Sequence, residues 1–347
     1  MELLDVVDEN DNITGISLDR SEIHNKNLLH REVIIFILNS KDEILIQKRS
    51  SNKKSDPNKW GLCAGHVDSG EEPFVSALRE VEEEVGLKLR EDELIFVNKE
   101  LEEKEHNSHF NYMYYCVCDW DVDKFTIQKE ELDEVKWMNI NELIDRIRNH
   151  DSDFCLNDDK VDELRLIQTI RYNYIETDRL ILRKAREDDL DTIYNSIWSK
   201  WEIAKYMLWE VTKDLEDAEV RMGKTINYQS KNFAYFITLK DTGKVIGFCG
   251  FKEIDNNIFE DSGLCIAEEY QGLGYAKEVV RKIVDIVFNN LNGKRFIYGC
   301  FRENEKSKNV CLKLGFKYLK SENCIRDYDQ YKYINDEYYL DNKRSNN

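Results

Sequence analysis

Residues 65–87 constrain the fold of this chain more than any other segment, because they combine helix signals with a dense cluster of glutamates. Pro73 suits the first turn of a helix, where its missing N–H is not needed. Gly86 suits the left-handed position just after a helix end. The two residues predict a helix between them. An apolar stripe along this helix predicts that it docks on a sheet; the stripe consists of Val75, Leu78, Val81 and Val85.

A second face of the predicted helix is acidic. Glu80, Glu83 and Glu84 are spaced i, i+3 and i+4, so their carboxylates share one side. Crowded carboxylates repel one another, and a hard cation such as Mg²⁺, which prefers oxygen ligands, would relieve that repulsion. A solvated acidic face is the alternative, since charge runs usually are one. A solvated face would not require the glycine and the further charged residues that stand in register before the helix.

The segment resembles the Nudix box at every fixed position, namely Gly65, Glu71, Arg79, Glu80, Val81, Glu83, Glu84, Gly86 and Leu87. The resemblance implies an alpha/beta/alpha sandwich with a mixed sheet, a divalent metal (Mg²⁺ or Mn²⁺) and hydrolysis of a small-molecule substrate of the nucleoside-diphosphate type or of another diphosphate. It also implies the metal ligands: the Gly65 carbonyl and the carboxylates of Glu80, Glu83 and Glu84. Of these, Glu83 and Glu84 are expected to act in catalysis.

Two further roles follow from the same resemblance. Arg79 is expected to orient Glu71 by an ion pair rather than to contact the substrate. A general base outside the box is expected at Glu131, with Glu134 as its neighbour in the same acidic segment. A solvated acidic loop is the alternative interpretation of that segment.

Parts of the first half resemble, more narrowly, the Nudix subgroup related to isopentenyl-diphosphate isomerase; they are Leu4–Glu9, Arg20–His24, Leu28–Arg31, Gln47–Ser50, Pro57–Trp60 and Gly65–Val67. Isomerisation is therefore an alternative to hydrolysis. In the isomerases a catalytic Cys stands where this chain has Ala64, and the adjacent Cys63 is expected to point elsewhere. A Glu-x-Glu stands where this chain has His109 and Asn111. These departures, with the intact box, favour hydrolysis.

Four histidines fall near the positions at which isomerase-like proteins hold an additional metal: His24, His30, His66 and His109. The spacing between His24 and His30 is one residue short of that pattern. Ordinary hydrogen-bonded or surface histidines are the alternative, and the sequence leaves both open.

Charge and cysteine usage exclude several classes of protein. Residues 1–170 carry 40 acidic and 21 basic side chains, whereas residues 171–347 carry 29 of each. This balance disfavours DNA binding, which depends on cationic phosphate contacts. Nine cysteines without paired CxxC motifs are typical of reduced core residues and not of zinc sites. No apolar run suggests a membrane span and the N-terminus has no signal-peptide pattern, so we expect a cytoplasmic protein.

Turn residues and alternation predict the remaining elements of the first half. We expect strands at 33–38, 44–47, 112–118 and 134–139, and helices at 141–149 and 160–172. With the box helix, these elements predict a mixed sheet covered by helices.

The second half begins with an alternating segment, 175–183, that predicts a strand, followed by a helix at 187–198 and strands at 233–239 and 245–251. Residues 262–267 predict a strand that leads into a glycine-bearing loop and a helix at 276–290. In that loop, Gly272 and Gly274 would let backbone N–H groups approach a pyrophosphate at the helix N-terminus. A strand at 295–301 and a helix from Asn304 to Leu314 complete the pattern.

This order of elements resembles the GNAT acetyltransferases, of the subgroup related to ribosomal-protein N-terminal acetyltransferases. The resemblance implies a central mixed sheet flanked by helices, acetyl-CoA as cosubstrate, and an amine acceptor that is a small molecule or a protein N-terminus. The backbone of Cys265 and Ile266 is expected to hold the pantetheine arm, and Asn304 to bind the cofactor. The pyrophosphate loop is expected to be Gln271, Gly272, Leu273, Gly274, Tyr275 and Ala276.

The catalytic groups of the second half are less well indicated. Many GNAT members use a Tyr where this chain has Cys311, which leaves Ser307 as the candidate acid for the leaving thiolate. A helix-capping hydroxyl is the alternative for Ser307. Glu253 is a possible base, and the acceptor pocket is expected around residues 198–228.

The sequence thus predicts a bifunctional α/β enzyme with a Nudix hydrolase domain at 1–170, a GNAT acetyltransferase domain at 174–335 and a polar tail at 336–347. The alternative from another class is a ligand-binding sensor or regulator in which one domain is inactive. The intact box argues against this for the first domain, whereas the missing tyrosine leaves it open for the second.

Overall fold

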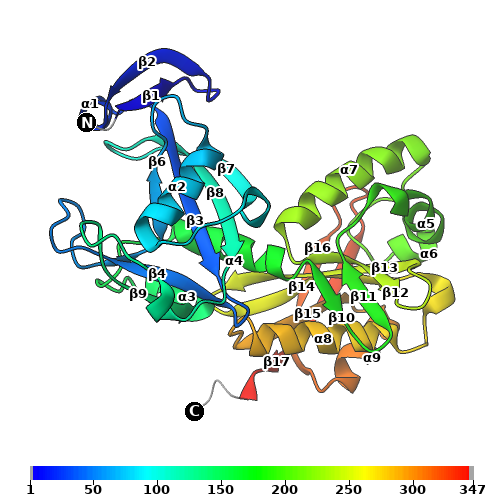
Figure 1. The fold of residues 1–347 in the computed structure, drawn as a ribbon. Coiled ribbons are helices and arrows are strands. Elements are labelled where there is room, and N and C mark those ends of the chain that lie inside the picture. Colours follow the sequence, from blue (N-terminus) through cyan, green and yellow to red (C-terminus); the bar gives the residue numbers. More distant parts are fainter. Residues whose placement is uncertain (1–2, 344–347) are drawn as a thin grey trace. The chain divides into compact units, whose positions relative to one another are not determined.

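The computed structural model describes residues 3–343 (Figure 1). The chain divides into two compact units, Met1–Ile167 and Gln168–Asn347. Both are of the mixed α/β class, with helices packed on mixed sheets.

The first unit is built on a seven-stranded mixed sheet. Its path runs β5-β4-β3-β8-β7, with β6 paired to β3 and β9 paired to β4. Only β3 and β8 pair in parallel. The strands are β3 (His30–Leu38), β4 (Glu43–Arg49), β5 (Trp60–Gly61), β6 (Cys63–His66), β7 (Ile95–Glu102), β8 (His109–Val117) and β9 (Leu132–Asn139).

Strand β3 is buried on both faces, so it separates two hydrophobic cores. Val33, Ile35 and Ile37 face α2 (Pro73–Val85), which packs on β3 and β6. Ile34, Phe36 and Leu38 alternate with them and face α3 (Ile140–Arg148) and the first part of α4 (Asp159–Arg171). The expected sandwich is confirmed, because helices cover both faces of the sheet.

The sequence did not predict the segment before β3. It forms a hairpin of β1 (Leu3–Val7) and β2 (Ile13–Asp19), followed by α1 (Arg20–Lys26). Asp19 caps α1 through a bond from the Ser21 N–H. The Asp5 carboxylate accepts hydrogen bonds from Ser69 and from the Gly70 N–H, which fixes the hairpin against the loop before α2.

The second unit contains an eight-stranded sheet of order β10-β11-β12-β13-β14-β15-β17-β16. Only β14 and β15 pair in parallel. The strands are β10 (Tyr174–Glu176), β11 (Leu180–Arg183), β12 (Ala234–Leu239), β13 (Val245–Asp255), β14 (Ile258–Ile266), β15 (Arg295–Phe301), β16 (Lys317–Ile325) and β17 (Lys332–Asp341).

Helices cover both faces of this sheet. One core packs α8 (Tyr275–Asn289) and α9 (Glu305–Lys313) against the strands. The other core packs the segment Leu190–Ala204 and α7 (Leu215–Lys231) against the opposite face. Within the Leu190–Ala204 segment lie α5 (Leu190–Ile193), the π-helical turn η4 (Tyr194–Trp198) and α6 (Trp201–Ala204).

The parallel pair β14–β15 separates halfway along its length. The two strands pair only from Ile258–Glu260 opposite Arg295–Ile297, although β14 continues to Ile266 and β15 to Phe301. Beyond Glu260, β14 therefore keeps its pairing with β13 but is not paired with β15, next to the loop that opens α8.

Three expectations about elements of the second unit are corrected. The strand expected at 175–183 is the hairpin β10–β11, because residues Thr177–Arg179 turn the chain. The helix expected at 187–198 is broken into a 3₁₀ turn, α5 and the π-helical η4. Residues 336–341, expected in a polar tail, belong to β17, where Tyr338 is 3% exposed. The remaining tail residues 344–347 lie outside the described residues.

No helix within residues 3–343 is long and apolar enough to cross a membrane.

Candidate active sites

Local signals set the bounds of α2, which carries the first candidate site. The helix begins at Pro73, and Gly86 ends it with a φ of 71° and an N–H bond to the Glu82 carbonyl. A side chain at Gly86 would also approach Thr126 to 3.0 Å, so both backbone and packing require glycine there. These local signals fix both ends of α2 and therefore the position of its glutamates relative to β6.

The three box carboxylates lie on one side of α2 but differ in burial. The Glu84 carboxylate is buried and accepts a hydrogen bond of 2.8 Å from Gln47 Nε2 on β4. Glu80 is largely buried, with 15% of its side chain exposed, whereas Glu83 is half-exposed. The burial of the three carboxylates therefore decreases from Glu84 in the core, through Glu80, to Glu83 at the solvent.

Gly65 lies directly beneath the Glu80 carboxylate. A Cβ at this position would lie 2.2–2.6 Å from the Glu80 carboxyl atoms. Only glycine permits this approach, which brings the backbone of β6 beside the carboxylates. Strand β6, whose Gly65 carbonyl is expected to bind the metal, therefore lies beside the Glu80 carboxylate.

Arg79 connects Glu71 to the box. Its guanidinium lies 3.1 Å from a Glu71 oxygen, 2.7 Å from Glu80 and 3.3 Å from Glu83. The Ser76 hydroxyl also donates to Glu71, at 2.5 Å. The expected Arg79–Glu71 pair is present, and the arginine contacts box carboxylates as well.

Burial and like charge make the box receptive to a cation. Burial, together with the neighbouring Glu84 carboxylate, raises the pKa of Glu80 to about 7. Burial also raises the pKa of Glu84. Two buried carboxylates that oppose each other's ionisation are the donors that a divalent cation stabilises. The residues present thus fit the metal that the Nudix resemblance implies.

Glu131 lies near the end of α2, as the chemistry of a base would need. The loop that precedes it bonds to the helix end through Thr126 N–H to the Val85 carbonyl and Gln128 N–H to the Glu84 carbonyl. The Glu131 carboxylate forms an ion pair with Lys53, whose charge also acts on Glu84. The base assignment stays a prediction.

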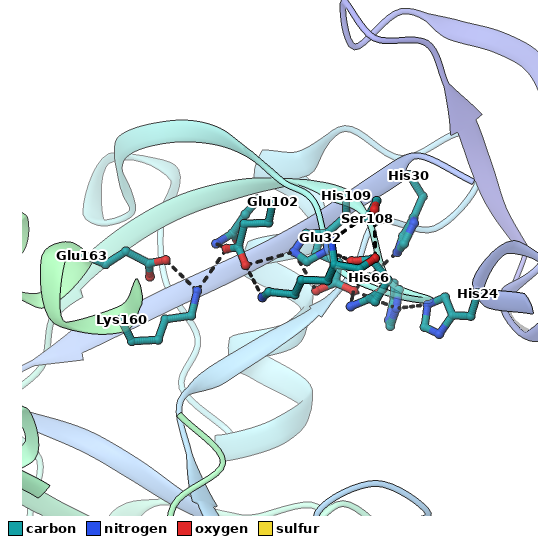
Figure 2. A network of polar contacts seen from close by, with 12 residues as sticks. His24, His30, Glu32, His66, Glu102, Ser108, His109, Lys160 and Glu163 are labelled. Atoms are coloured by element: carbon teal, nitrogen blue, oxygen red, sulfur yellow. Dashed lines mark hydrogen bonds and ion pairs between the residues drawn. The ribbon is translucent and has the colours of Figure 1, made fainter. Parts of the chain in front are cut away.

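The opposite face of β6 and β3 holds a cluster of histidines, which Figure 2 shows. His24, His30, Glu32 and His66 each offer one ligand atom, and these atoms all lie within 4.8 Å of one another. His66 Nε2 lies 3.1 Å from Glu32 and 3.3 Å from His24 Nε2. The sequence did not indicate Glu32, because its contact with the histidines depends on the pairing of β3 with β6.

Backbone carbonyls orient two of these imidazoles. His30 Nδ1 lies 3.1 Å from the Leu28 carbonyl, and His109 Nδ1 lies 2.9 Å from the Asn107 carbonyl. A proton on each Nδ1 leaves the Nε2 lone pair facing the cluster, as in metal-binding histidines. His30 Nε2 is buried and lies 3.4 Å from a Glu32 oxygen, without a well-aligned hydrogen bond to a described residue. This nitrogen and the Glu32 carboxylate are thus both available as metal ligands.

The electrostatics favour neutral imidazoles at His24 and His109 beside one ionised carboxylate. Burial, followed by His66 and His30, lowers the pKa of His24 to about 4. Burial likewise lowers the pKa of His109, which lies 3.3 Å from Glu32. Although burial acts against it, the adjacent His30, His66 and His109 imidazoles hold the pKa of Glu32 well below its ordinary value. Neutral imidazoles and an ionised carboxylate are the protonation states that a metal requires.

Two neighbouring residues bear on the isomerase alternative. Cys63 points into the core under α2, where burial and the Glu84 carboxylate raise its pKa far above the ordinary value. Ala64 lies on the other face of β6 and is exposed. A methyl group therefore occupies the place at which the isomerase resemblance would require a thiol.

In the second unit, the loop from Gln271 to Ala276 leads into α8. Gly272 and Gly274 have φ values of 81° and 88°, and Gly274 caps the helix. A Cβ at Gly272 would meet nothing within 4 Å, so the loop borders open space. Arg179 braces it, donating to the Leu273 carbonyl and pairing with Glu278 at 2.7 Å. The helix N-terminus and the separated strands fit the pyrophosphate and pantetheine of acetyl-CoA.

The other residues expected at the cofactor lie around this opening. Cys265 and Ile266 are at the end of the half of β14 that is not paired with β15, with their side chains buried. Gln271 donates to the Ile266 carbonyl at 2.9 Å and accepts from Lys306. The Asn304 carboxamide oxygen caps α9 by accepting from the Ser307 N–H.

The structure adds Tyr298 to the candidates. Its hydroxyl lies 2.8 Å from Ser307 Oγ, and the ring is buried on β15. The GNAT resemblance implies a tyrosine four residues after Ser307. Tyr298 instead precedes Ser307 by nine residues and belongs to a strand. By contrast, the Glu253 carboxylate accepts a hydrogen bond from the Asn257 N–H. This carboxylate, suggested as a base, therefore bonds within the turn between β13 and β14.

Comparison with known families agrees with this division. The NUDIX domain model matches residues 28–157, and the acetyltransferase (GNAT) domain model matches residues 179–317. The chain therefore carries two enzyme domains. It belongs to the Nudix family through its first half and to the GNAT N-acetyltransferases through its second.

Individual relatives match one half each. Nudix hydrolase 3 of Arabidopsis thaliana is 34% identical over 49% of this chain, which spans only 23% of that relative's length. The uncharacterized N-acetyltransferase p20 of Bacillus licheniformis is 32% identical over 45% of this chain and 87% of the relative. The isopentenyl-diphosphate Delta-isomerase of Pectobacterium atrosepticum is 31% identical over 41% of this chain and 79% of the relative.

Proposed function

We propose that the first unit hydrolyses a small-molecule diphosphate with a divalent metal at the box. The observation that carries this proposal is the register of Glu80, Glu83 and Glu84 above Gly65. A bound Mg²⁺ or Mn²⁺ would offset the phosphate charge and acidify a water molecule. The protein would hold that ion with the three carboxylates and the Gly65 carbonyl.

The remaining groups suit the same reaction. Hydrolysis joins a water oxygen to phosphorus, breaks the bridging P–O bond and releases a proton from the water. Glu131 is our candidate to take that proton, and its Lys53 partner would hold it near the end of α2. Arg79 keeps Glu71, Glu80 and Glu83 in place through its ion pairs.

Phosphate release with Mg²⁺ present tests this proposal. Glu83→Gln should abolish activity, because it removes a metal-facing carboxylate that is half-exposed and not part of the core. Ala64→Cys is the matched control: it introduces the thiol that the isomerase resemblance implies, and it should leave hydrolysis unchanged. Hydrolysis that survives Glu83→Gln, or isomerisation of isopentenyl diphosphate by the wild type, would refute the hydrolase proposal.

We further propose that the histidine cluster binds a transition-metal ion separate from the box ion. The cluster offers three imidazoles and one carboxylate, and transition-metal ions bind imidazole ligands more readily than Mg²⁺ does. The position of His30 Nε2, 3.4 Å from a Glu32 oxygen, and the contact of its Nδ1 with the Leu28 carbonyl support this set. His109, beside Glu32, completes the surroundings.

Metal titration distinguishes this site from the box. Metal-free protein is titrated with Mn²⁺ or Zn²⁺ alone, and one ion should bind at the histidine cluster. The Glu32→Gln variant should lose this ion, whereas the Glu83→Gln variant should still bind it. Calorimetry gives the stoichiometry, and elemental analysis of the purified protein gives the resident ion. A stoichiometry unaffected by Glu32→Gln would refute the site.

For the second unit we propose acetyl transfer from acetyl-CoA to an amine. The amine attacks the thioester carbon, a C–N bond forms, the C–S bond breaks, and the sulfur takes up a proton as the amine loses one. Ser307, with the buried Tyr298 hydroxyl behind it, is our candidate donor of that proton. The half of β14 that is not paired with β15 and the loop before α8 support the cofactor assignment.

Calorimetry with acetyl-CoA tests this cofactor assignment. Gly274→Glu places a carboxylate at the N-terminus of α8, at a residue with a φ of 88°, and should abolish binding. Unchanged affinity in this variant would contradict the assignment of the loop. Binding of acetyl-CoA without turnover of any amine would favour the sensor alternative for this unit.

A further inference from the structure

The second unit contains a pocket of about 320 Å³ between α7 and strands β12–β14. Its floor includes Gly250, Ser262 and Gly263, and Gly263 belongs to the half of β14 that has separated from β15. The pocket therefore borders the strand segment beside which the thioester is expected to lie. This position suits an acceptor amine.

The charged groups of the pocket are all cationic. Arg221 and Lys224 line it, and no Asp or Glu is among the described residues that do. Residues 171–347 as a whole carry 29 acidic and 29 basic side chains. The pocket is therefore electropositive within a half of the chain whose charges balance.

Arg221 is held without a carboxylate partner. Its guanidinium lies 4.6 Å from the ring centre of Trp198 and 4.3 Å from that of Trp209. It donates one hydrogen bond, of 2.9 Å, to the Thr212 hydroxyl. Among the described residues it forms no ion pair, and burial lowers its pKa to about 10. A guanidinium has five N–H donors, so most of them remain for a ligand.

A second unused donor lies beside the arginine. Trp209 Nε1 is buried and has no hydrogen-bond partner among the described residues. A buried donor without an acceptor is unfavourable, which indicates that an acceptor group is supplied from outside. The remaining walls combine aromatic side chains, among them Phe236 and Phe248, with the uncharged polar side chains of Thr225, Gln229 and Ser262.

We propose that this pocket binds the acetyl acceptor and that the acceptor is an amine carrying an anionic group, carboxylate or phosphate, next to an apolar or aromatic group. Arg221 and Trp209 Nε1 bind the anion, Lys224 adds charge at the rim, and the aromatic walls hold the skeleton. This proposal rests on the acetyl transfer proposed above. It excludes polyamines and lysine-rich peptides as preferred acceptors, because both are polycations.

Matched ligands test the anion requirement without turnover. The protein with acetyl-CoA is titrated with two acids and with partners that are neutral at the position of the anionic group: L-phenylalanine against L-phenylalanine amide, and 2-aminoethyl phosphate against 2-aminoethanol. Quenching of the pocket tryptophans and thermal stabilisation report binding. At least one acid should bind about tenfold or more tightly than its partner, with the preference falling as salt rises.

Variants assign that preference to the pocket. Arg221→Gln should reduce the acid-over-neutral ratio to about one, and Lys224→Gln should reduce it by about threefold. Lys224 is exposed, so its variant tests the proposal even if the packed arginine proves necessary for folding. Arg281→Gln, on an exposed part of α8, is the control and should keep the full ratio.

The outcomes separate this proposal from the one on which it rests. Loss of the ratio in Arg221→Gln with unchanged acetyl-CoA affinity supports the anion site. Equal binding of acids and neutral partners, or no binding of any acid while acetyl-CoA binds, overturns the anion site alone. Failure of acetyl-CoA itself to bind the wild type refutes the acetyltransferase proposal instead.

Discussion

At the scale of single residues, Gly65 shows how a backbone position can set the geometry of a metal site. The absent side chain lets β6 approach the Glu80 carboxylate, and any Cβ would lie within 2.2–2.6 Å of it. The sequence indicated the glycine through its place in the box. The structure adds the physical reason, which is the contact with Glu80.

Gly65→Ala should therefore displace Glu80 and disable the box. We expect metal affinity and phosphate release to fall by about tenfold or more, because a contact of this length cannot be accommodated without moving the carboxylate. Ala64→Ser, on the exposed neighbouring residue, is the control and should retain both. Calorimetric titration with Mn²⁺ measures the affinity, and wild-type affinity in Gly65→Ala would show that Glu80 is not a ligand.

Glu163 on α4 offers a test of buried electrostatics. Lys160 pairs with both Glu163, at 2.6 Å, and Glu102, at 3.1 Å (Figure 2). Glu163 is 6% exposed and its second oxygen has no hydrogen-bond partner among the described residues. Burial, only partly offset by Lys160, raises its pKa from 4.5 to about 7. One lysine thus serves two carboxylates.

Because the folded protein holds a proton on Glu163 that the unfolded chain releases above pH 4.5, this group should make the free energy of unfolding fall between pH 4.5 and about 7. Glu163→Gln should remove that fall and stabilise the protein above this window by on the order of 2 kcal/mol. Urea unfolding across the window measures it. The exposed Asp162→Asn serves as control, and a parallel pH dependence in wild type and Glu163→Gln would refute the shifted titration.

At the scale of elements, the sequence predicted those whose signals are local. The helix at 73–85 follows from Pro73 and Gly86, and the strand at 295–301 from its own apolar alternation. Strand β17 escaped prediction, because its sequence is largely polar and its place depends on pairing with β15 and β16. Elements fixed by distant partners are not encoded in a short window.

The candidate sites divide in the same way. The box carboxylates occupy consecutive turns of one helix, so spacing alone indicated that they lie together. Glu32 and Tyr298 were missed, because each reaches its partners across strand pairings or from strand to helix. Arg221 carried no signal in the sequence, because an arginine on a helix usually faces solvent or an acidic partner.

Helix α7, which carries Arg221, also contains an interior glycine. Gly223 has a helical φ, is exposed, and a Cβ there would meet nothing within 4 Å. Gly223→Ala should raise the free energy of unfolding by about 0.5–1 kcal/mol, because it reduces the freedom of the unfolded chain. Thermal unfolding measures this gain. A loss of stability would show that α7 is not helical through this residue.

At the scale of the whole molecule, the chain joins two enzyme domains whose charge differs sharply. All excess negative charge lies in residues 1–170, which hold the box. The acidic domain would hold its anionic substrate through a bound cation, whereas the electropositive pocket of the second domain would bind an anion directly. Family membership covers residues 28–157 and 179–317, so both activities belong to a single polypeptide.

The central claim is that two independent active sites operate in this chain, and one parallel assay tests it most directly. Hydrolysis of nucleotides, dinucleotides, nucleotide sugars and coenzyme A esters is measured with Mg²⁺ as release of phosphate or of a phosphomonoester, together with thiol release from acetyl-CoA across a panel of amines. Wild type, Glu83→Gln and Gly274→Glu are compared. We expect Glu83→Gln to lose only this hydrolysis and Gly274→Glu to lose only thiol release. Loss of both activities in either variant, or the absence of both in the wild type, would contradict the account.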